Sequence, residues 1–171
     1  MIGLVYYLPS PRHVGVAKMY EILNTVEPFQ QSGRKTVLVV VDQLPDASIV
    51  SRFDFVQAYG IKPFGIPAVR QICVVKDNST FFDAVEFPLY TLEITEGKLP
   101  GGNGIPWDWS VAKTFCERYP TLIAGGITTE NVADVIRQAH PFGIDVSSGV
   151  ESSPGVKDMD KVKRLIENAR L

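Results

Sequence analysis

Short apolar runs alternate with segments of helical spacing, and this alternation constrains the fold more than any other feature of the sequence. Residues 36–41 read Thr-Val-Leu-Val-Val-Val, and such a run without polar alternation predicts a strand buried on both faces, as in a parallel sheet. In residues 14–26 the apolar side chains recur three and four positions apart, which predicts an amphipathic helix. Residues 2–7 form an apolar run before that helix and predict another strand. A strand, a helix and a strand in succession indicate parallel strands with covering helices.

The same alternation continues along the chain and predicts an α/β fold with a single domain over residues 1–171. Further strands are expected at residues 55–59, 72–76, 88–94, 121–124 and 143–146. Further helices are expected at residues 46–53, 109–119, 132–139 and 162–169. Between residues 60 and 67 the chain carries two glycines and two prolines, which excludes a long helix there.

The charge balance limits the partners of the protein. With 17 Lys and Arg against 19 Asp and Glu, the formal net charge is -2, which excludes a nucleic-acid binder that works by bulk positive charge. No apolar run reaches the ~18 residues of a membrane-spanning helix. The first residues lack the basic segment and the cleavage site of a signal peptide. We therefore expect a cytoplasmic protein with no nucleic-acid or membrane partner.

Cysteine and histidine are scarce in this sequence. Cys73 and Cys116 lie in apolar surroundings without a Cys-x-x-Cys spacing, and His13 and His140 are far apart along the chain. These four residues are too few and too scattered for a zinc site. We therefore expect reduced, buried cysteines and no bound metal.

Two consecutive expected strands end in small residues, at the end of the strand where parallel α/β folds place their ligands. Residues 121–124 run into two glycines, and residues 143–146 run into Ser-Ser-Gly. Small residues let backbone N–H groups approach a ligand closely, and the start of a following helix favours a phosphate. Each motif alone is compatible with a simple tight turn. Because the two motifs recur one strand–helix unit apart, we predict that they bind phosphate through Gly125, Gly126, Ser147, Ser148 and Gly149.

Several segments resemble one enzyme family. Residues 101–110, Gly-Gly-Asn-Gly-Ile-Pro-Trp-Asp-Trp-Ser, are similar to the glycine-rich loop and the Phe-Asp-Trp helix start of phosphoribosylanthranilate isomerases. Residues 122–132 and 143–158 are similar to the C-terminal signature of that family almost residue for residue. Residues 7–14 resemble the family's segment after its second strand. The resemblance covers most of the chain and is weakest in the middle.

The resemblance implies a (βα)8 barrel of the TIM type and an enzyme of tryptophan biosynthesis. The family's substrate is N-(5'-phosphoribosyl)anthranilate, a phosphorylated small molecule, and its Amadori rearrangement uses no metal and no cofactor. A general acid protonates the ribose ring oxygen and opens the ring to a Schiff base, and a general base then removes the proton at C2'. In the family the base is a cysteine that ends the first strand, and the acid is an aspartate that ends the sixth.

The chain departs from the family pattern where the base is expected. The first strand with its Lys-Ile-Cys-Gly motif is not found, because residues 1–4 already align with the second strand. Cys73 lies inside a different expected strand and Cys116 on the apolar face of a helix, so neither matches the base. We therefore expect a barrel that lacks its first βα unit and has a shortened middle. Such a barrel has unpaired edges, which a homo-oligomer or a partner chain would cover.

The position of the acid is also altered. Residues 87–93 align with the strand that ends in the family's aspartate, and without a gap Leu92 falls on the aspartate position. Glu93 is one residue further on, and in a regular strand it points to the opposite face. A β-bulge would turn it inward. Glu93 is thus our candidate catalytic acid, with an ordinary solvated carboxylate as the alternative.

Other positions match the family's substrate contacts. Arg12 matches an arginine near the anthranilate carboxylate, for which a planar guanidinium is suited; the alternative is a surface charge after a proline turn. Gly102 and Gly104 match the glycine-rich loop, and Asp145 matches a residue that contacts substrate or holds the loops. Tyr59 and Ile105 stand where the family has a histidine and a lysine.

Three hypotheses remain open at this point. The chain is an active isomerase with another source for the base, or a barrel remnant that binds a phosphorylated ligand without turning it over. The third hypothesis is a split enzyme whose first βα unit comes from another polypeptide.

Overall fold

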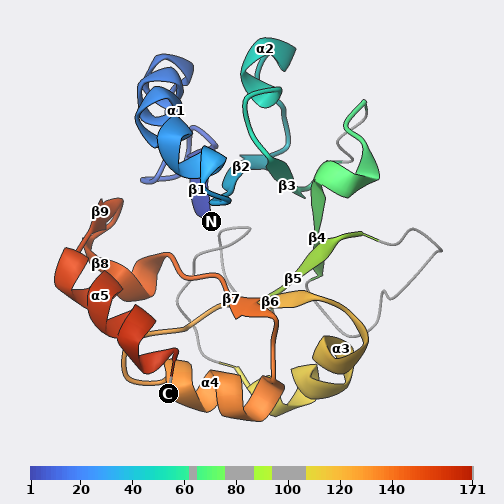
Figure 1. Ribbon diagram of the computed structural model, residues 1–171, viewed down its shortest axis with the longest axis vertical. Helices are drawn as coiled ribbons and strands as arrows, with labels where there is room; N and C mark the ends of the chain where they lie inside the picture. The colour runs from blue at the N-terminus through green and yellow to red at the C-terminus, as the bar shows by residue number, and fades with distance from the viewer. Residues whose placement is uncertain (62–64, 76–86, 94–106, 171) are drawn as a thin grey trace. The chain divides into compact units, whose positions relative to one another are not determined.

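The computed structural model describes residues 1–61, 65–75, 87–93 and 107–170. Their contacts divide the chain into two compact units, of which one contains Met1–Cys73 and the other contains Leu89–Leu171. Figure 1 shows the strands and helices of both units in chain order. Gly102 and Gly104, which the sequence predicts as substrate contacts, lie outside the described residues.

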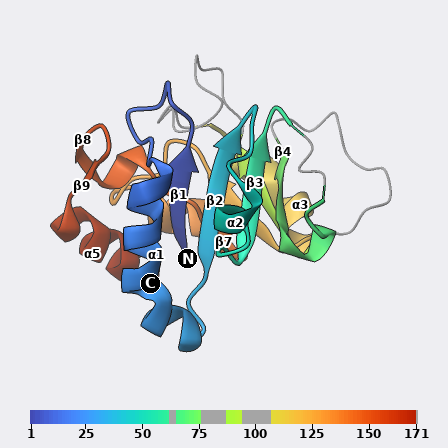
Figure 2. The same cartoon turned by 90° about the horizontal axis from the view of Figure 1, so that it is seen from above.

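In the first unit the apolar runs of the sequence form adjacent parallel strands. The register is in line across them, with Leu4 opposite Leu38 and Leu38 opposite Val56. The next strand continues the ladder, since Val56 lies opposite Gln71. Figure 2 shows these strands with the helices that follow them. The elements are β1 (Ile2–Tyr6), α1 (Val16–Gln31), β2 (Thr36–Val41), α2 (Ala47–Val50), β3 (Phe55–Tyr59), η1 (Ala68–Arg70) and β4 (Gln71–Val75).

The core of the first unit lies between α1 and the strands. Met19 and Leu23, four positions apart on α1, are fully buried together with Leu38 of β2. The α2 segment adds Ile49, which is also fully buried. The helical spacing of the sequence therefore buries one face of α1 against apolar strands.

The amino-terminal ends of these strands carry a polar network. Asp54, the residue before β3, accepts hydrogen bonds from the backbone N–H and hydroxyl of Thr36, from the Gln30 amide and from the Lys35 ammonium, at 2.9–3.0 Å. Burial raises the pKa of Asp54, but these hydrogen bonds outweigh it and lower the pKa from 3.8 to about 2. The network thus ties the end of α1 to the starts of two strands.

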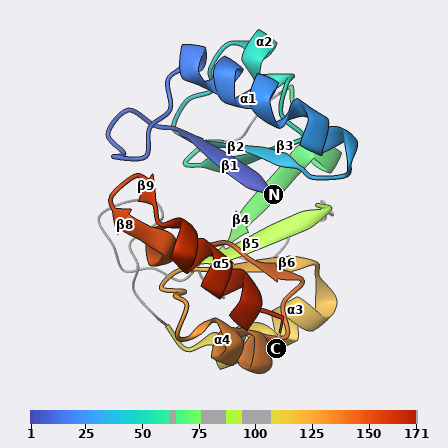
Figure 3. The ribbon, with the colours of Figure 1, turned by 60° about the vertical axis from the view of Figure 1, so that its left-hand side comes forward.

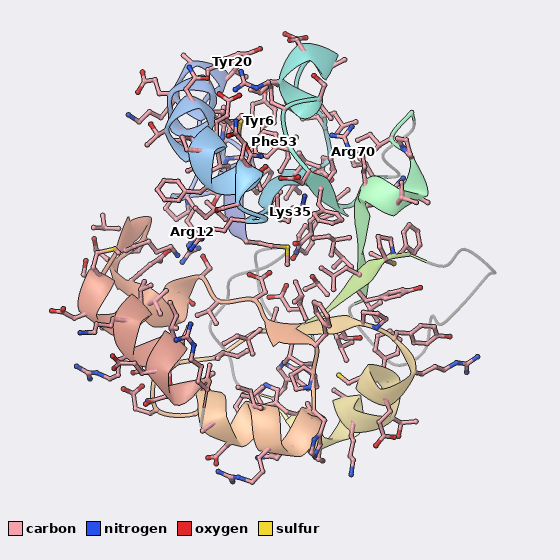
Figure 4. The ribbon with its side chains drawn as sticks, viewed as in Figure 1. Tyr6, Arg12, Tyr20, Lys35, Phe53 and Arg70 are labelled. Carbon is pink, nitrogen blue, oxygen red and sulfur yellow. The ribbon has the colours of Figure 1, made fainter. Side chains whose placement is uncertain are left out.

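Arg70 closes the turn after α2. Its guanidinium donates to the backbone carbonyls of Val50, Phe53 and Asp54, and Figure 4 labels Arg70 and Phe53 among these elements. Carbonyls at the end of a helix have no partner within the helix, so one side chain satisfies several groups that would otherwise need water.

In the second unit three further strands run parallel. Leu92 lies opposite Ile123, which lies opposite Ile144. Helices follow the strands, and Figure 3 shows them on one side of these strands. The elements are β5 (Leu89–Glu93), η2 (Trp109–Ala112), α3 (Lys113–Arg118), β6 (Thr121–Ala124), α4 (Val132–Ala139), β7 (Gly143–Ile144), η3 (Ser148–Val150), β8 (Glu151–Ser153), β9 (Val156–Lys157) and α5 (Met159–Asn168).

Local sequence explains where these helices begin. The Asp108 carboxylate accepts a hydrogen bond from the Ser110 backbone N–H at the start of η2. The Asp158 carboxylate accepts from Asp160 and Lys161 at the start of α5. Both are N-caps, which satisfy N–H groups that the first helical turn leaves free.

The structure differs from the sequence prediction at several elements, and the expected helix at 46–53 is confined to Ala47–Val50. α1 continues through Pro28 to Gln31 instead of ending near residue 26. The expected helix at 109–119 is a 3-10 turn followed by α3, and the expected strand at 143–146 ends at Ile144. The last helix begins at Met159, three residues earlier than expected, because Asp158 caps it. None of the helices within the described residues is long and apolar enough to cross a membrane.

Candidate functional site

Glu93 ends β5 with its side chain on the face that α3 does not cover. The Tyr90 ring packs edge-on against Phe115 of α3, with 5.6 Å between the ring centroids. Side chains alternate along a strand, so Leu92 shares the helix-covered face and Glu93 lies on the other. The β5–β6 ladder is regular up to the pair Glu93 and Ala124, so no bulge is needed to bring Glu93 there. Glu93 is 2% exposed, and it is therefore not a solvated surface carboxylate.

Gly125, directly after β6, lies between Glu93 and an indole ring. Its φ is +91°, and a Cβ there would lie 3.2 Å from Trp107 Nε1 and 3.6 Å from Glu93 Cγ. The Trp107 Nε1–H donates to the Ala124 carbonyl at 2.9 Å. A glycine at this position therefore lets the carboxylate and the indole flank the backbone at the carboxyl ends of β5 and β6.

The two loops that the sequence predicts for phosphate lie against each other. A Cβ on Gly149 would overlap the carbonyl oxygen of Ile127, so the backbone of the 147–149 loop touches the backbone of the loop after β6. Glycine at position 149 is required by this contact. The structure thus brings Gly125, Gly126 and Gly149 to one place within the second unit.

Asn131 holds the loop after β6 in shape. Its Nδ2 donates to the Gly126 carbonyl at 2.8 Å, and its Oδ1 accepts from the Thr128 N–H at 2.8 Å. These bonds fix the chain between the glycine pair and the start of α4. Gly126 has a φ of +66°, a conformation that glycine adopts without strain.

Three backbone N–H groups of these loops, those of Gly126, Ser148 and Gly149, donate to no acceptor within the described part of the chain. Several N–H donors in one small region, carried by glycines and serines, suit the oxygens of a phosphate. The arrangement can therefore bind an anion through the backbone.

Asp145 extends the strand edge next to this region. Its backbone N–H donates to the Ile123 carbonyl at 2.8 Å, which continues the β6–β7 ladder one residue beyond Ile144. The Asp145 side chain is half-buried and engages in an interaction within the protein. Its position between β7 and Ser147 fits a residue that holds the loop.

Arg12 belongs to the first unit, on the turn between β1 and α1. Its backbone N–H donates to the Ser10 hydroxyl at 3.1 Å, and the neighbouring His13 Nδ1 accepts the Tyr7 N–H at 3.1 Å. These bonds shape the loop that presents the half-buried guanidinium, labelled in Figure 4.

Neither cysteine has the environment of an activated thiol. Burial raises the pKa of Cys73. Burial also raises the pKa of Cys116 to about 11, an effect only partly offset by a hydrogen bond with Thr121. A thiol whose pKa is raised is protonated near neutral pH and is a poor base or nucleophile.

Two residues of this region were missed as site residues by the sequence reasoning. Neither Trp107 nor Asn131 is among the site residues predicted from the sequence. The signal for Trp107 was present, since it stands where the family motif has phenylalanine, and an indole brings an N–H donor that phenylalanine lacks.

Parallel strands, covering helices and glycine- and serine-rich loops at the strand ends define an α/β protein of the TIM-barrel type. The fold of a phosphoribosylanthranilate isomerase from Thermotoga maritima matches it with a TM-score of 0.77, at 29% identity over 98% of this chain and 86% of that chain. The family model of N-(5'-phosphoribosyl)anthranilate isomerase matches residues 56–168. The chain belongs to this family, the isomerases of tryptophan biosynthesis, which confirms the resemblance in the sequence.

Individual relatives agree with this assignment. The N-(5'-phosphoribosyl)anthranilate isomerase of Desulfatibacillum aliphaticivorans is 35% identical over 98% of this chain and 82% of its own length. The isomerase of Geotalea daltonii is 33% identical over 99% of this chain and 85% of its own length. A solved isomerase in complex with reduced 1-(o-carboxyphenylamino)-1-deoxyribulose 5-phosphate (rCdRP) matches with a TM-score of 0.73 and 26% identity, over 98% of this chain and 86% of that chain.

Proposed function

We propose that this chain binds N-(5'-phosphoribosyl)anthranilate and takes part in its isomerisation in the cytoplasm. One observation carries the proposal: the two small-residue loops of the second unit touch each other through Gly149, close to a buried carboxylate on β5. The related isomerase that binds rCdRP has a ligand with a 5-phosphate, which supports a phosphate ester as the ligand class.

In this proposal the phosphate is bound by Gly125, Gly126, Ser147, Ser148 and Gly149. Backbone N–H donors can hold a phosphate without direct contact from a cationic side chain, so a chain of net charge -2 can still bind one. Arg12 binds the anthranilate carboxylate, Asp145 holds the loop after β7, and Gly102 and Gly104 contact the substrate.

Glu93 is the proposed general acid. A protonated carboxyl at the end of β5 would donate its proton to the ribose ring oxygen while the C1'–O bond breaks and the anthranilate nitrogen forms the Schiff base. Removal of the C2' proton then gives an enol that relaxes to the keto product. This role is supported by the burial of Glu93 and by its position on the face of β5 that α3 does not cover.

A second candidate function is binding of the phosphorylated ligand without turnover. It is favoured by the raised pKa of both thiols, since the family's base is a cysteine and neither thiol is suited to that role. In this case the chain acts alone as a binding protein or supplies the phosphate-binding part of an assembly with a second copy or a partner chain.

Rescue of a tryptophan auxotroph that lacks the isomerase tests the proposal. The chain as printed and the chain preceded by the first βα unit of a relative are compared. Growth of either supports isomerisation, and growth of the extended chain alone assigns the base to the added unit. If neither supports growth while the purified chain binds rCdRP, binding without turnover is the function.

A Glu93→Gln variant tests the acid in whichever chain is active. Glutamine keeps the size of the side chain and one acceptor oxygen, but its amide is far too weak an acid to transfer a proton to the ring oxygen. We expect kcat to fall by about 100-fold or more, with rCdRP affinity within a few-fold of wild type. Unchanged turnover would exclude Glu93 as the acid.

A further inference from the structure

The β8–β9 hairpin reaches the predicted phosphate loop through one side chain. The Lys157 ammonium donates to the Ser147 carbonyl at 2.8 Å and to the Glu151 Oε1 at 2.9 Å, with the Ser147 hydroxyl at 3.4 Å. Ser147 lies ten residues earlier in the chain. Lys157 is therefore a cross-link between the hairpin and the first residue of the Ser147–Gly149 loop.

The cross-link is fixed at both of its ends. The Glu151 side chain is 4% exposed against 43% for Lys157, so the ammonium is drawn to a carboxylate that has little access to water. The Lys161 ammonium donates to the Glu151 carbonyl at 2.8 Å, and the Asp158 N–H donates to the Val150 carbonyl at 2.9 Å. Charge-assisted bonds of this kind hold an ammonium in one position better than a solvated pair does.

The contact with Lys157 fixes the orientation of the Ser147–Ser148 peptide. The carbonyl of Ser147 and the N–H of Ser148 belong to one planar trans peptide, in which they point in opposite directions. A carbonyl held on Lys157 therefore turns the Ser148 N–H away from the hairpin. That N–H has no acceptor within the described residues.

We propose that Lys157 is a positioning residue for the phosphate loop: by holding the Ser147 carbonyl, it aims the Ser148 N–H at a phosphate monoester. The inference rests on the proposed phosphate site at Ser147–Gly149 and adds to it a residue that does not itself contact the ligand. Without the ammonium, the Ser147 carbonyl keeps, among the described residues, only the longer hydrogen bond from the Val150 N–H at 3.4 Å. The Ser147–Ser148 peptide can then rotate more freely and turn its carbonyl dipole toward the phosphate, which repels it.

Binding of rCdRP and of inorganic phosphate, measured by calorimetry on the full chain, tests this role. Lys157→Met removes the ammonium but keeps the aliphatic stem, and we expect about tenfold weaker binding of rCdRP. Lys163→Met is the matched control, because it removes an exposed ammonium from α5, the helix that follows the hairpin. We expect Lys163→Met to bind rCdRP within about twofold of wild type, so that the loss of one positive charge is separated from the loss of the Ser147 contact.

Lys157→Arg keeps a donor at the same place, and we expect it to recover most of the rCdRP affinity. The thermal midpoint without ligand is measured for all variants, since a purely structural role would lower it without this pattern in affinity. Equal affinity of wild type and Lys157→Met for both ligands would overturn the role of Lys157 and leave the phosphate site intact. If wild type bound neither ligand, the phosphate site itself would be wrong, and the inference would be refuted with it.

Discussion

The two units differ in where their polar groups lie and in whether those groups have hydrogen-bond partners. Those of the first unit lie before the strands, and those of the second unit lie after them. In the first unit Asp54 and Arg70 lie directly before strands, and their hydrogen-bonding groups are satisfied by neighbouring side chains and carbonyls. In the second unit the loops after β6 and β7 are shaped by Asn131 and Lys157, yet they leave N–H groups without an acceptor among the described residues. In barrels of this type the amino-terminal ends of strands serve stability and the carboxyl ends bind ligands. The comparison therefore predicts that substitutions in the two regions affect different measurements.

The largest effect is expected from Gly149→Ala, which disrupts the contact between the 147–149 loop and the loop after β6. The new Cβ would overlap the Ile127 carbonyl, so the loops must separate. We expect loss of measurable rCdRP binding and a fall of about 3 kcal/mol in the free energy of unfolding. Calorimetry and urea unfolding measure the two quantities.

Gly15→Ala is the control for this substitution. A Cβ at Gly15 has no atom within 4 Å, and the backbone φ of -70° suits any residue. Gly15 is the N-cap of α1, where alanine is less favourable than glycine, so we expect a loss of at most about 1 kcal/mol and wild-type binding. Tight rCdRP binding by Gly149→Ala would show that the contact between the loops does not matter for the ligand.

Arg70→Met is expected to act on stability alone. It removes the guanidinium from three carbonyls around the end of α2, and we expect about 2 kcal/mol of destabilisation in urea unfolding. The exposed Arg137, paired with Asp134 at 2.7 Å on α4, provides the control, since Arg137→Met should cost at most about 0.5 kcal/mol. A loss of rCdRP affinity in folded Arg70→Met would contradict the division between the two regions.

Asp54 gives the first unit a defined pH dependence. Its pKa is about 2 in the folded protein against the ordinary 3.8, so the folded state favours the charged form. The stabilisation is fully present above about pH 4 and is lost as the pH falls toward 2, with an upper bound of about 2 kcal/mol. Urea unfolding at a series of pH values measures it.

Asp54→Asn provides the comparison, because the amide does not titrate. We expect this variant to be less stable than wild type at neutral pH and to lose less stability between pH 4 and pH 2. Parallel pH curves for the two proteins would show that Asp54 does not carry the effect.

The smallest effect is expected from Trp107→Phe, which restores the residue type of the family motif. It removes the hydrogen bond from Trp107 Nε1 to the Ala124 carbonyl, worth about 1 kcal/mol. Trp109→Phe is the matched change, because the Trp109 Nε1–H is buried without a partner among the described residues. We expect Trp107→Phe to lower rCdRP affinity more than Trp109→Phe does. The reverse order would show that Trp107 does not contribute to the ligand site.

Much of the strand pattern could be predicted because it depends on local apolar runs. Residues 36–41, 55–59 and 121–124 form strands with the expected bounds. The continuation of α1 through Pro28 could not be predicted, because proline is unfavourable inside a helix. In the folded protein the packing of α1 outweighs this unfavourable propensity. The face of Glu93 could not be predicted either, because only the contact of Tyr90 with α3 identifies which face of β5 the helix covers.

The site was predicted in part for a similar reason. The glycine and serine motifs are continuous in sequence and were found there, whereas the approach of Gly149 to Ile127 joins two separate loops. The residues that hold these loops, Asn131 and Lys157, act through side-chain contacts with backbone carbonyls. A pattern of residue types contains no information on which carbonyl a side chain reaches.

The placement of Trp107 against Gly125 and near Glu93 has an optical consequence. The chain contains two tryptophans, so Trp109→Phe leaves a single indole, whose ring nitrogen is bonded to the strand end that carries the glycine loop. Indole emission shifts when its hydrogen bonding or a nearby charge changes. Trp107 is thus an intrinsic fluorophore beside the candidate site, and we expect its emission to change when the ligand binds.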